Sequence, residues 1–375
     1  MLFDPLAQIS EKIEDALKLG LEYNKNVQTK ETFSIPHIAN TRPDGTAVAK
    51  YALLLAGEEK PEDGTLQEAL ADLKAKFREP FSKLHYGVLP YIICYTASGK
   101  QVQFYSLQLD AITGVIHYNT PEGRAKVLHV VTNLYRLLLK MKETLPEPGG
   151  LALFEKVKRP SGAVVEAGFY SVKKTIRGAA SFFETAGTSA EHVKAAYQVA
   201  KTTRFLVQAA QGPVVHRDVY LVEGKPLGCP AVVKSEEDVR RLVHDLLHGL
   251  DKLHTANICH RDIQQPNVIS CLDASNSLAR YILIDLESAA PAGASLPAVH
   301  YDAWEDETLV GGRYVAESDL YQLAKMVQIT ARSGAVELSE DARALLKELR
   351  GKQRSASSLL QENWVSCKCG QGLAV

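Results

Sequence analysis

Three oxygen-bearing side chains in the second half of this 375-residue chain carry the pattern best suited to chemistry. His260-Arg261-Asp262 is followed by Asn267, and Asp285 then closes the apolar run at residues 281–284. Hard divalent cations prefer oxygen ligands, and phosphoryl transfer depends mostly on positioning and on charge neutralisation. The pattern therefore predicts a site that holds a hydroxyl beside a metal-bound triphosphate, as in a phosphotransferase.

Each of the three residues has its own expected role. Asp262 would be the base that orients or deprotonates the acceptor hydroxyl, while Asn267 and Asp285 would hold Mg²⁺ against ATP. An acidic residue at the end of a buried strand can face a ligand while its strand stays in the core. We therefore expect ATP and Mg²⁺ as cofactors, Asp262 and Asn267 as catalytic residues, and Asn267 and Asp285 as metal ligands.

The order and spacing of these residues resemble the protein kinase superfamily. His260-Arg261-Asp262 with Asn267 is similar to its catalytic loop, and Asp285-Leu286-Glu287 is similar to its Asp-Phe-Gly metal motif. The resemblance implies an α+β, two-lobed fold with a β-rich small lobe and a helical large lobe. It also implies transfer of the γ-phosphoryl group of ATP to a protein hydroxyl, that of serine or threonine.

Two residues further along the chain also resemble family positions. Asp319 is similar to the buried aspartate that pins the backbone of the catalytic loop, and Arg354 is similar to the arginine of the last helix. Each has a plainer alternative. Asp319 would be favoured by the dipole at the start of any helix, and Arg354 would be a solvated surface charge.

The small lobe should supply a lysine for the phosphates of ATP. Residues 169–173 alternate as a strand does and end in Lys173, similar to the Val-Ala-Ile-Lys strand of the family, so we expect Lys173 to hold the α- and β-phosphates. Lys174 points to the opposite face of such a strand and competes for the role if the register differs by one residue. Two solvated lysines at a strand end are the alternative without a function.

A helical acid should pair with that lysine, and Glu184 and Glu191 are the candidates. We prefer Glu191, as a nucleotide-site residue, because residues 191–204 have apolar side chains at helical spacing. The segment Thr188-Ser189-Ala190-Glu191 also has the pattern of a capping box, in which the glutamate serves its own helix. The two interpretations remain open.

Three positions depart from the family pattern. Residues 154–168 contain only Gly162 and Gly168 where the family has a run of spaced glycines over the phosphates. Gln264 stands where serine/threonine kinases carry a lysine, and Leu286-Glu287 replaces Phe-Gly. Two alternatives follow. One is a small-molecule kinase of the aminoglycoside or choline kinase type, whose metal motif resembles Asp285-Leu286-Glu287, and the other is a pseudokinase scaffold that transfers nothing.

His216-Arg217-Asp218 repeats the tripeptide but lacks its partner, because Glu223 stands where an asparagine is needed. The β-branched and aromatic residues that follow predict a strand, which leads into a hinge at residues 224–228. We expect no catalytic role for this copy.

The sequence predicts four parts: an N-terminal α/β extension over residues 1–150, a small lobe and hinge over 151–228, a large lobe over 229–366 and a tail over 367–375. The breaker Pro146-Glu147-Pro148-Gly149-Gly150 sets the first boundary. Inside the extension we expect helices over 6–23, 66–76 and 124–143, and a hairpin formed by 91–95 and 101–105. The extension is loosely similar to those of fungal-specific and Crinkler-type effector kinases, which implies a kinase directed to a host cell, and a structural brace is the alternative.

Composition limits the partners. A formal net charge of -1 with 46% hydrophobic residues gives the chain a large core and no overall attraction to nucleic acid or anionic membranes. No apolar run approaches the length of a membrane span, and the first residues do not form a secretory signal. We therefore expect a cytoplasmic or nuclear protein that binds ATP and a protein substrate, without a membrane or a specific nucleic acid.

Overall fold

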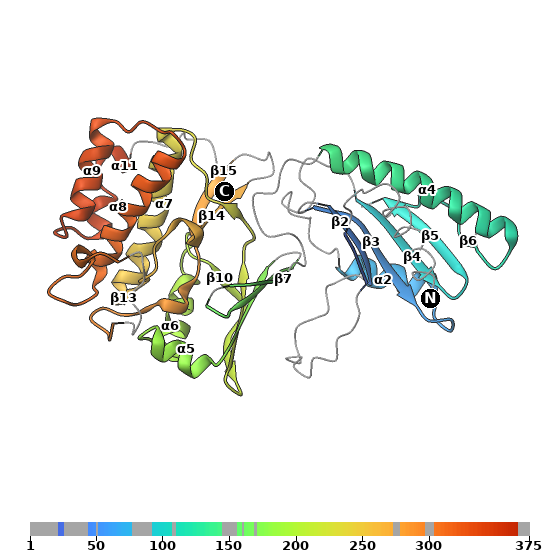
Figure 1. Cartoon of the computed structure of the whole chain (residues 1–375), viewed down its shortest axis with the longest axis horizontal. Helices are drawn as coiled ribbons and strands as arrows, with labels where there is room; N and C mark the ends of the chain where they lie inside the picture. The colour runs from blue at the N-terminus through green and yellow to red at the C-terminus, as the bar shows by residue number, and fades with distance from the viewer. Residues whose placement is uncertain are drawn as a thin grey trace. The chain divides into compact units, whose positions relative to one another are not determined.

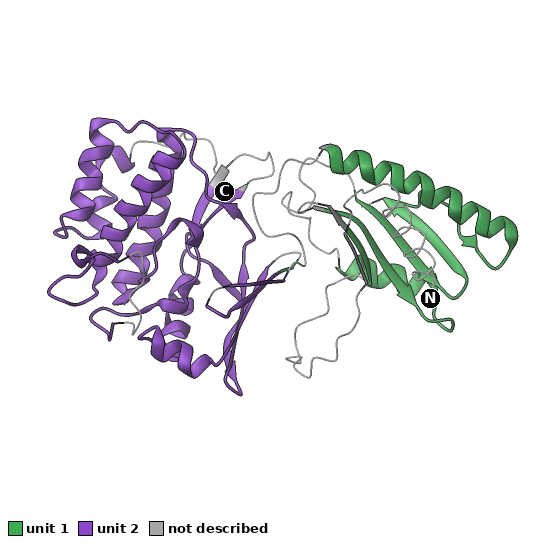
Figure 2. Ribbon diagram, viewed as in Figure 1, with its two compact units in different colours: residues 1–155, 167–170 green, residues 156–166, 171–375 purple. Residues whose placement is uncertain are grey.

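The computed structural model divides the chain into two compact units (Figure 1, Figure 2). Unit 1 comprises Met1–Glu155 with Ala167–Tyr170, and unit 2 comprises Lys156–Glu166 with Ser171–Val375. Each unit contains both helices and strands, so the α+β class is confirmed. The structure describes residues 22–25, 44–49, 52–76, 92–106, 110–144, 156–159, 161–168, 171–272, 278–296 and 304–366.

Unit 1 is built on a six-stranded sheet with the strands in sequence order. Neighbouring strands are antiparallel except β3 and β4, which run parallel and are connected through a helix, α2 (Leu66–Lys76). A parallel pair needs such a crossover because a tight turn reverses the chain. The strands are β1 (Glu22–Lys25), β2 (Gly45–Ala49), β3 (Ala52–Lys60), β4 (Ile93–Ser98), β5 (Gln101–Ser106) and β6 (Ile116–His117).

The core of unit 1 lies between this sheet and the long helix α4 (Pro121–Thr144), which runs along the sheet in Figure 1. Apolar side chains of α4 recur at helical spacing and pack on the inner side chains of β4 and β5. They are Val127, Val131, Tyr135, Leu138 and Met141.

Most elements expected for the extension form where the sequence indicates. The helix at 66–76 and the hairpin of β4 and β5 are confirmed, and the helix expected over 124–143 begins earlier, at Pro121. The helix expected over 6–23 is wrong at its end, because residues 22 and 23 belong to β1 and pair with β2. Residues 6–21 and the breaker at 146–150 lie outside the described residues.

Unit 2 begins with a five-stranded sheet in the order β10-β11-β9-β8-β7. Two helices, α5 (Ala179–Thr185) and α6 (Ala190–Ala200), connect β9 to β10. The strands are β7 (Lys156–Lys158), β8 (Val164–Ala167), β9 (Val172–Arg177), β10 (Gln208–His216) and β11 (Val219–Lys225).

The rest of unit 2 is mainly helical. Its small strands pair as β12-β14-β15 and β13-β16, and they hold the loops that carry Asp262 and Asp285. The helices are α7 (Glu236–Thr255), α8 (Ala316–Ser333), α9 (Glu340–Arg350), α10 (Ala356–Leu359) and α11 (Asn363–Ser366). The strands are β12 (Cys229–Pro230), β13 (Ile258–Cys259), β14 (Val268–Leu272), β15 (Leu278–Leu283) and β16 (Ala290–Pro291).

Helix α7 is the centre of this helical part. Ser235 caps its first turn by accepting a hydrogen bond from the Asp238 amide at 3.2 Å, and Lys252 and His254 stand in its last turn, where cations are favourable. Its apolar stripe packs on β15, α8 and α10. The fully buried members of the stripe include Val243, Leu246, Leu247, Leu250 and Leu253.

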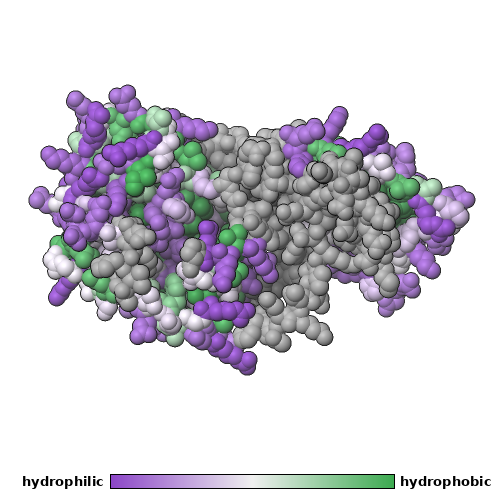
Figure 3. All heavy atoms as spheres, viewed as in Figure 1, coloured by the Kyte–Doolittle hydropathy of each residue, from purple (hydrophilic) through white to green (hydrophobic). Residues whose placement is uncertain are grey.

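The outer surface has the composition expected around such cores. Figure 3 shows hydrophilic side chains over most of the described part of one face, with hydrophobic ones in small separate patches. Within the described parts of the chain, every helix is too short or too polar to cross a lipid bilayer.

Replacing Leu246 by Ala should destabilise unit 2 by about 2 to 5 kcal/mol, because Leu246 is fully buried and its loss leaves a cavity. Both tryptophans, Trp304 and Trp364, lie in unit 2, so their fluorescence in a urea titration follows this unit alone. Lys252→Ala on an exposed turn of the same helix is the control, and we expect it to change stability by less than about 0.5 kcal/mol. Equal midpoints for the two variants would contradict the assigned core.

Candidate functional site

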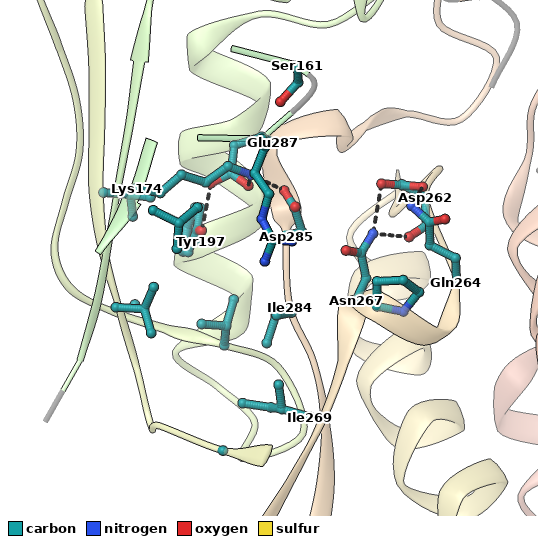
Figure 4. Close-up of a pocket in the computed structure, with 18 of the residues that line it drawn as sticks. Ser161, Lys174, Tyr197, Asp262, Gln264, Asn267, Ile269, Ile284, Asp285 and Glu287 are labelled. Atoms are coloured by element: carbon teal, nitrogen blue, oxygen red, sulfur yellow. Dashed lines mark hydrogen bonds and ion pairs between the residues drawn. The ribbon is translucent and has the colours of Figure 1, made fainter. Parts of the chain in front are cut away.

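Three of the residues expected to do chemistry, Asp262, Asn267 and Asp285, line one cavity of unit 2, with a volume of about 380 Å³ (Figure 4). The five-stranded sheet forms one wall, and the loops that follow β13 and β15 form the other. Apolar side chains from both walls line part of the cavity, and charged or amide side chains gather at one end. The polar members that matter below are Lys174, Asp262, Asn267, Asp285 and Glu287.

Lys174, not Lys173, reaches into this cavity. Its Nζ lies 2.5 Å from Asp285 Oδ1 and 2.9 Å from Glu287 Oε2 (Figure 4). Lys173 is the neighbour in β9 and pairs in register with Glu223, so its side chain lies on the other face of the sheet. The structure therefore places Lys174, the expected competitor, and not Lys173 at the cavity, because successive side chains of β9 point to opposite faces of the sheet.

Glu287 is the acidic partner that sequence reasoning missed. Its side chain is 1% exposed, and Oε1 accepts hydrogen bonds from Tyr197 at 3.0 Å and Tyr220 at 2.8 Å while Oε2 faces Lys174. Tyr197 comes from α6 and Tyr220 from β11, so three separate elements hold one carboxylate. The sequence did contain a signal for it, an acidic residue two positions after Asp285, but the sequence analysis interpreted that residue as part of a metal motif.

Glu191 does not take part in this network. It is exposed in the first turn of α6, whose N-cap Ser189 accepts a hydrogen bond from the His192 amide at 3.2 Å. Backbone and Ser189 hydrogen bonds at this helix terminus lower the pKa of Glu191. The preference for Glu191 as the partner of the lysine is thus corrected: it serves the helix end, and α6 contributes Tyr197 to the site instead.

The buried charges near Lys174 shift one another in opposite directions. Burial alone would raise the pKa of Asp285, but the ammonium of Lys174 holds that pKa well below its usual range. Burial and the nearby Asp285 carboxylate raise the pKa of Glu287 to about 7, against the opposing effect of Lys174. Lys174 stays protonated, because the two carboxylates raise its pKa although burial lowers it. The cavity therefore holds a permanent cation beside an ionised Asp285.

Asp262 and Asn267 form a second polar group across the cavity (Figure 4). Asn267 Nδ2 donates to Asp262 Oδ2 at 2.7 Å and to the Asp262 carbonyl at 2.9 Å. Gln264 Nε2 donates to Asp262 Oδ1 at 2.9 Å. Burial and the charge of Asp285 raise the pKa of Asp262, while His260 and the two amides act in the opposite direction. The carboxylate is thus oriented through both oxygens.

The loops that carry these groups are tied to each other through the backbone. The Ile284 amide donates to the Asn267 carbonyl at 2.9 Å, and the His260 ring bonds the Ile284 carbonyl at 3.0 Å. Asp285 itself has φ 70°, in the left-handed region that non-glycine residues rarely adopt. Such strain persists only where surrounding contacts hold it, and Lys174 supplies one of them.

Asp319 pins the loop as the resemblance implies. It is fully buried at the start of α8 and accepts the amide hydrogens of His260 at 2.8 Å and Arg261 at 2.9 Å. It also accepts from the Tyr314 hydroxyl at 2.7 Å and contacts the His254 ring at 2.9 Å. The interpretation of Asp319 as only a helix-terminal charge is therefore too narrow.

Arg261 is buried beside this loop. Its guanidinium donates to the carbonyls of Gly187 and Ser295, at 2.8 Å each, and lies over the ring of Trp304. Trp304 Nε1 in turn donates to the Arg261 carbonyl at 3.1 Å. Arg261 thus joins the loop before α6 to the segment after β16.

A short turn between β7 and β8 covers one side of the cavity. The Arg159 amide donates to the Ala163 carbonyl at 2.8 Å, and the Gly162 amide donates to the Arg159 carbonyl at 2.9 Å. Gly162 has φ 81°, which explains a glycine at this position. Arg159 and Ser161 line the cavity, so this turn covers it with one glycine where the kinase pattern has a run of glycines.

The second His-Arg-Asp copy and Arg354 lie elsewhere. Arg217 and Asp218 form the turn of the β10–β11 hairpin, and Asp218 Oδ1 accepts the Ala180 amide at 2.8 Å at the start of α5. Arg354 pairs with Glu348 and Glu362 on the outside of the last helices. Neither contributes to the cavity, so the expectation of no catalytic role for the copy agrees with its position.

The donor set suits one hard dication. Asp285 supplies a carboxylate, and Asn267 can present its amide oxygen, because its Nδ2 is the atom that donates to Asp262. Mg²⁺ usually binds one or two protein oxygens together with waters and substrate phosphates. Among the described residues there is no group of three or more His, Cys, Asp or Glu side chains arranged to hold a metal.

Comparison with known proteins assigns no family to the chain. No protein-family model matches the sequence, and no curated protein matches it. What the site can do follows from its own side chains.

Asp319→Asn should destabilise unit 2 by about 3 to 5 kcal/mol, because it removes the buried carboxylate charge beside His254 and replaces one of the two oxygens that accept the loop amides with an NH2 group. Tryptophan fluorescence during urea unfolding measures this change. Glu317→Gln, in the same helical turn, is the matched control, and its stability should stay within about 0.5 kcal/mol of the parent. A neutral Asp319→Asn would show that the loop is held by other contacts.

Proposed function

We propose that unit 2 is an ATP- and Mg²⁺-dependent phosphotransferase with a two-lobed, protein kinase-like fold. The observation that carries this proposal is the single cavity in which Lys174 faces Asp285 while Asp262 and Asn267 lie opposite. The order of the elements supports the fold, because a five-stranded sheet with inserted helices precedes a helical part. The amide contacts of Asp319 support the resemblance at the loop itself.

The apolar part of the cavity suits a flat nucleotide base. Val165, Val172 and Val222 come from the sheet, while Ile269 and Ile284 come from the opposite wall (Figure 4 labels the two isoleucines). Ligand pockets commonly combine such apolar walls with a few polar groups that fix orientation. Here the polar groups lie at one end, so a base between the walls leaves its phosphates near Lys174 and Asp285.

The protein groups then divide the work of transfer. Asp262, oriented by Asn267 and Gln264, accepts a hydrogen bond from the acceptor hydroxyl and takes its proton as the oxygen bonds to the γ-phosphorus. The bond from the γ-phosphorus to the bridging oxygen breaks, and ADP leaves. Lys174 moves its charge from Asp285 toward the phosphates, while Glu287 keeps the lysine at the end of the cavity. Mg²⁺, held by Asn267 and Asp285, would neutralise negative charge on the phosphates.

A protein hydroxyl is the acceptor that we favour over a small molecule. In the small-molecule alternative Glu287 would be a second metal ligand, but both its oxygens are already engaged by Tyr197, Tyr220 and Lys174. Gln264 takes the place of a lysine, yet it still bonds Asp262. A pseudokinase scaffold has no need for two ionisable acids facing one cavity, because their repulsion costs stability unless a cation lies between them.

Lys174→Met should lower kcat/KM for ATP by about 10²-fold or more, because it removes the cation at the phosphate end. Lys173→Met is a matched control with the same chemical change on the other face of β9, and it should retain the parent rate. Transfer of label from γ-labelled ATP measures both. Loss of activity in Lys173→Met but not in Lys174→Met would show that Lys173, and not Lys174, serves the phosphates.

Asp285→Ala should abolish transfer while unit 2 remains folded, because a hard dication loses its carboxylate ligand.

The parent is incubated with Mg²⁺ and γ-labelled ATP together with generic proteins, aminoglycosides and choline. Label on protein supports the proposal, whereas label on a small molecule supports the alternative kinase class. No label on any acceptor, with no rise in melting temperature on adding ATP and Mg²⁺, would favour the scaffold.

A further inference from the structure

Unit 1 carries a second group of chemically capable side chains, at the carboxyl ends of β3 and β4. We call Asp44, Glu58 and Lys60 the strand-end cluster. Asp44 immediately precedes β2, and Glu58 and Lys60 lie at the end of β3, which runs parallel to β4. In open α/β sheets, ligands bind beyond the carboxyl ends of parallel strands. The cluster therefore stands at the edge of the sheet where a ligand is expected.

The strand register brings the cluster together. Gly45 of β2 pairs with Gly57 of β3, which places Asp44 beside Glu58, and the Glu59 amide donates to Asp44 Oδ2 at 3.0 Å. Glu58 and Lys60 are two residues apart and so point to the same face. Helix α2 covers that face, since its Lys76 pairs with Glu58 and its Asp72 pairs with Lys60.

Burying these charged side chains lowers the stability of unit 1 relative to a sheet end with apolar side chains in the same places. Glu58 is 2% exposed and lies beside the Asp44 carboxylate, with Lys76 as its ion-pair partner. The register also sets Thr96 opposite Glu58 and Ser98 opposite Lys60, and both hydroxyl residues are buried. Polar side chains therefore occupy a sheet face that a helix covers, where packing alone favours apolar ones.

Lys60 gives the cluster a side chain that reaches solvent. The Lys60 side chain is 26% exposed and its partner Asp72 is 49% exposed, so their ion pair can open at little cost. Lys60 would then be available to a bound anion, while Glu58 stays fixed by Lys76 beneath it.

We propose that Asp44, Glu58 and Lys60 form a metal-dependent site in unit 1 that hydrolyses phosphodiesters. Two adjacent carboxylates can hold Mg²⁺ or Mn²⁺, whose other ligands are waters and an oxygen of the substrate phosphate. A cation between the two carboxylates also removes their repulsion. Lys60, two residues from Glu58, offsets the negative charge that develops on the phosphate.

The reaction consumes one water. Its oxygen forms a bond to phosphorus, and the bond from phosphorus to one ester oxygen breaks. That oxygen takes a proton from the water and leaves as an alcohol, so the products are a phosphomonoester and a hydroxyl. The dication supplies the acidity of the bound water, as in other metal-assisted hydrolyses. No oxidant or nucleotide is required, which separates this activity from the phosphotransfer proposed for unit 2.

The full-length chain with Mn²⁺ or Mg²⁺ is tested on supercoiled plasmid DNA, a single-stranded RNA oligonucleotide and bis(4-nitrophenyl) phosphate. We expect metal-dependent cleavage that EDTA stops, and the three probes tell DNA, RNA and a small diester apart. Asp44→Asn and Glu58→Gln should each lose at least about 10²-fold in rate. Lys60→Met should lose a similar factor while it still binds Mn²⁺ in a calorimetric titration, whereas Asp44→Asn should bind Mn²⁺ at least about 10-fold more weakly.

Glu62→Gln is the matched control, because Glu62 is an exposed acid just beyond β3, and it should cleave at the parent rate. If Glu58→Gln fails to fold by circular dichroism, Asp44→Asn and Lys60→Met decide the result. The proposal is overturned if the parent cleaves none of the three probes, or if cleavage persists unchanged in both of those variants. It is also overturned if the parent does not bind Mn²⁺, or if Asp44→Asn binds Mn²⁺ as tightly as the parent does.

Discussion

The contact of Lys174 with Asp285 and Glu287 is the constraint on which the rest of unit 2 depends. It joins the sheet to the loop after β15, and it balances one fully buried carboxylate, Glu287, and one partly exposed carboxylate, Asp285. Burying a charge without a partner costs several kcal/mol, so the sheet, the loop and the lysine must be in place together. In the proposed function, the same ammonium that balances the two acids would contact the phosphates.

Glu287 gives this arrangement a particular character. Its carboxylate is held by a tyrosine from α6 and a tyrosine from β11, and it anchors Lys174 from the loop that also carries Asp285. Helix α6 contributes a hydroxyl rather than a charge. A shift of α6 would weaken one hydrogen bond to Glu287 but would leave the ion pair with Lys174 in place, which makes the proposed site less dependent on the position of that helix.

Both units place carboxylates next to lysines at strand ends, but they solve the problem of buried charge differently. In unit 2 the lysine comes from β9, in a different sheet from the strand that Asp285 follows, and Asp319 separately fixes the opposing loop through backbone amides. In unit 1 two lysines accompany Glu58, one from its own strand and one from α2. The net charge of the whole chain, -1, conceals this local pairing, because it averages over both units.

The sequence alone determined the residues that neighbour one another along the chain. Asp262 and Asn267 share one loop, and their hydrogen bond follows from that short separation. The helix at 66–76 and the β4–β5 hairpin follow from apolar spacing and a turn, which are local properties. Tertiary structure decided what local pattern leaves open. The pairing of β9 with β11 turns Lys174 instead of Lys173 to the cavity, since side chains alternate along a strand. Contacts between distant segments likewise place Glu287, and not Glu191, beside Lys174. The pairing of β2 with β3 places Asp44 beside Glu58, and such pairing depends on the whole sheet.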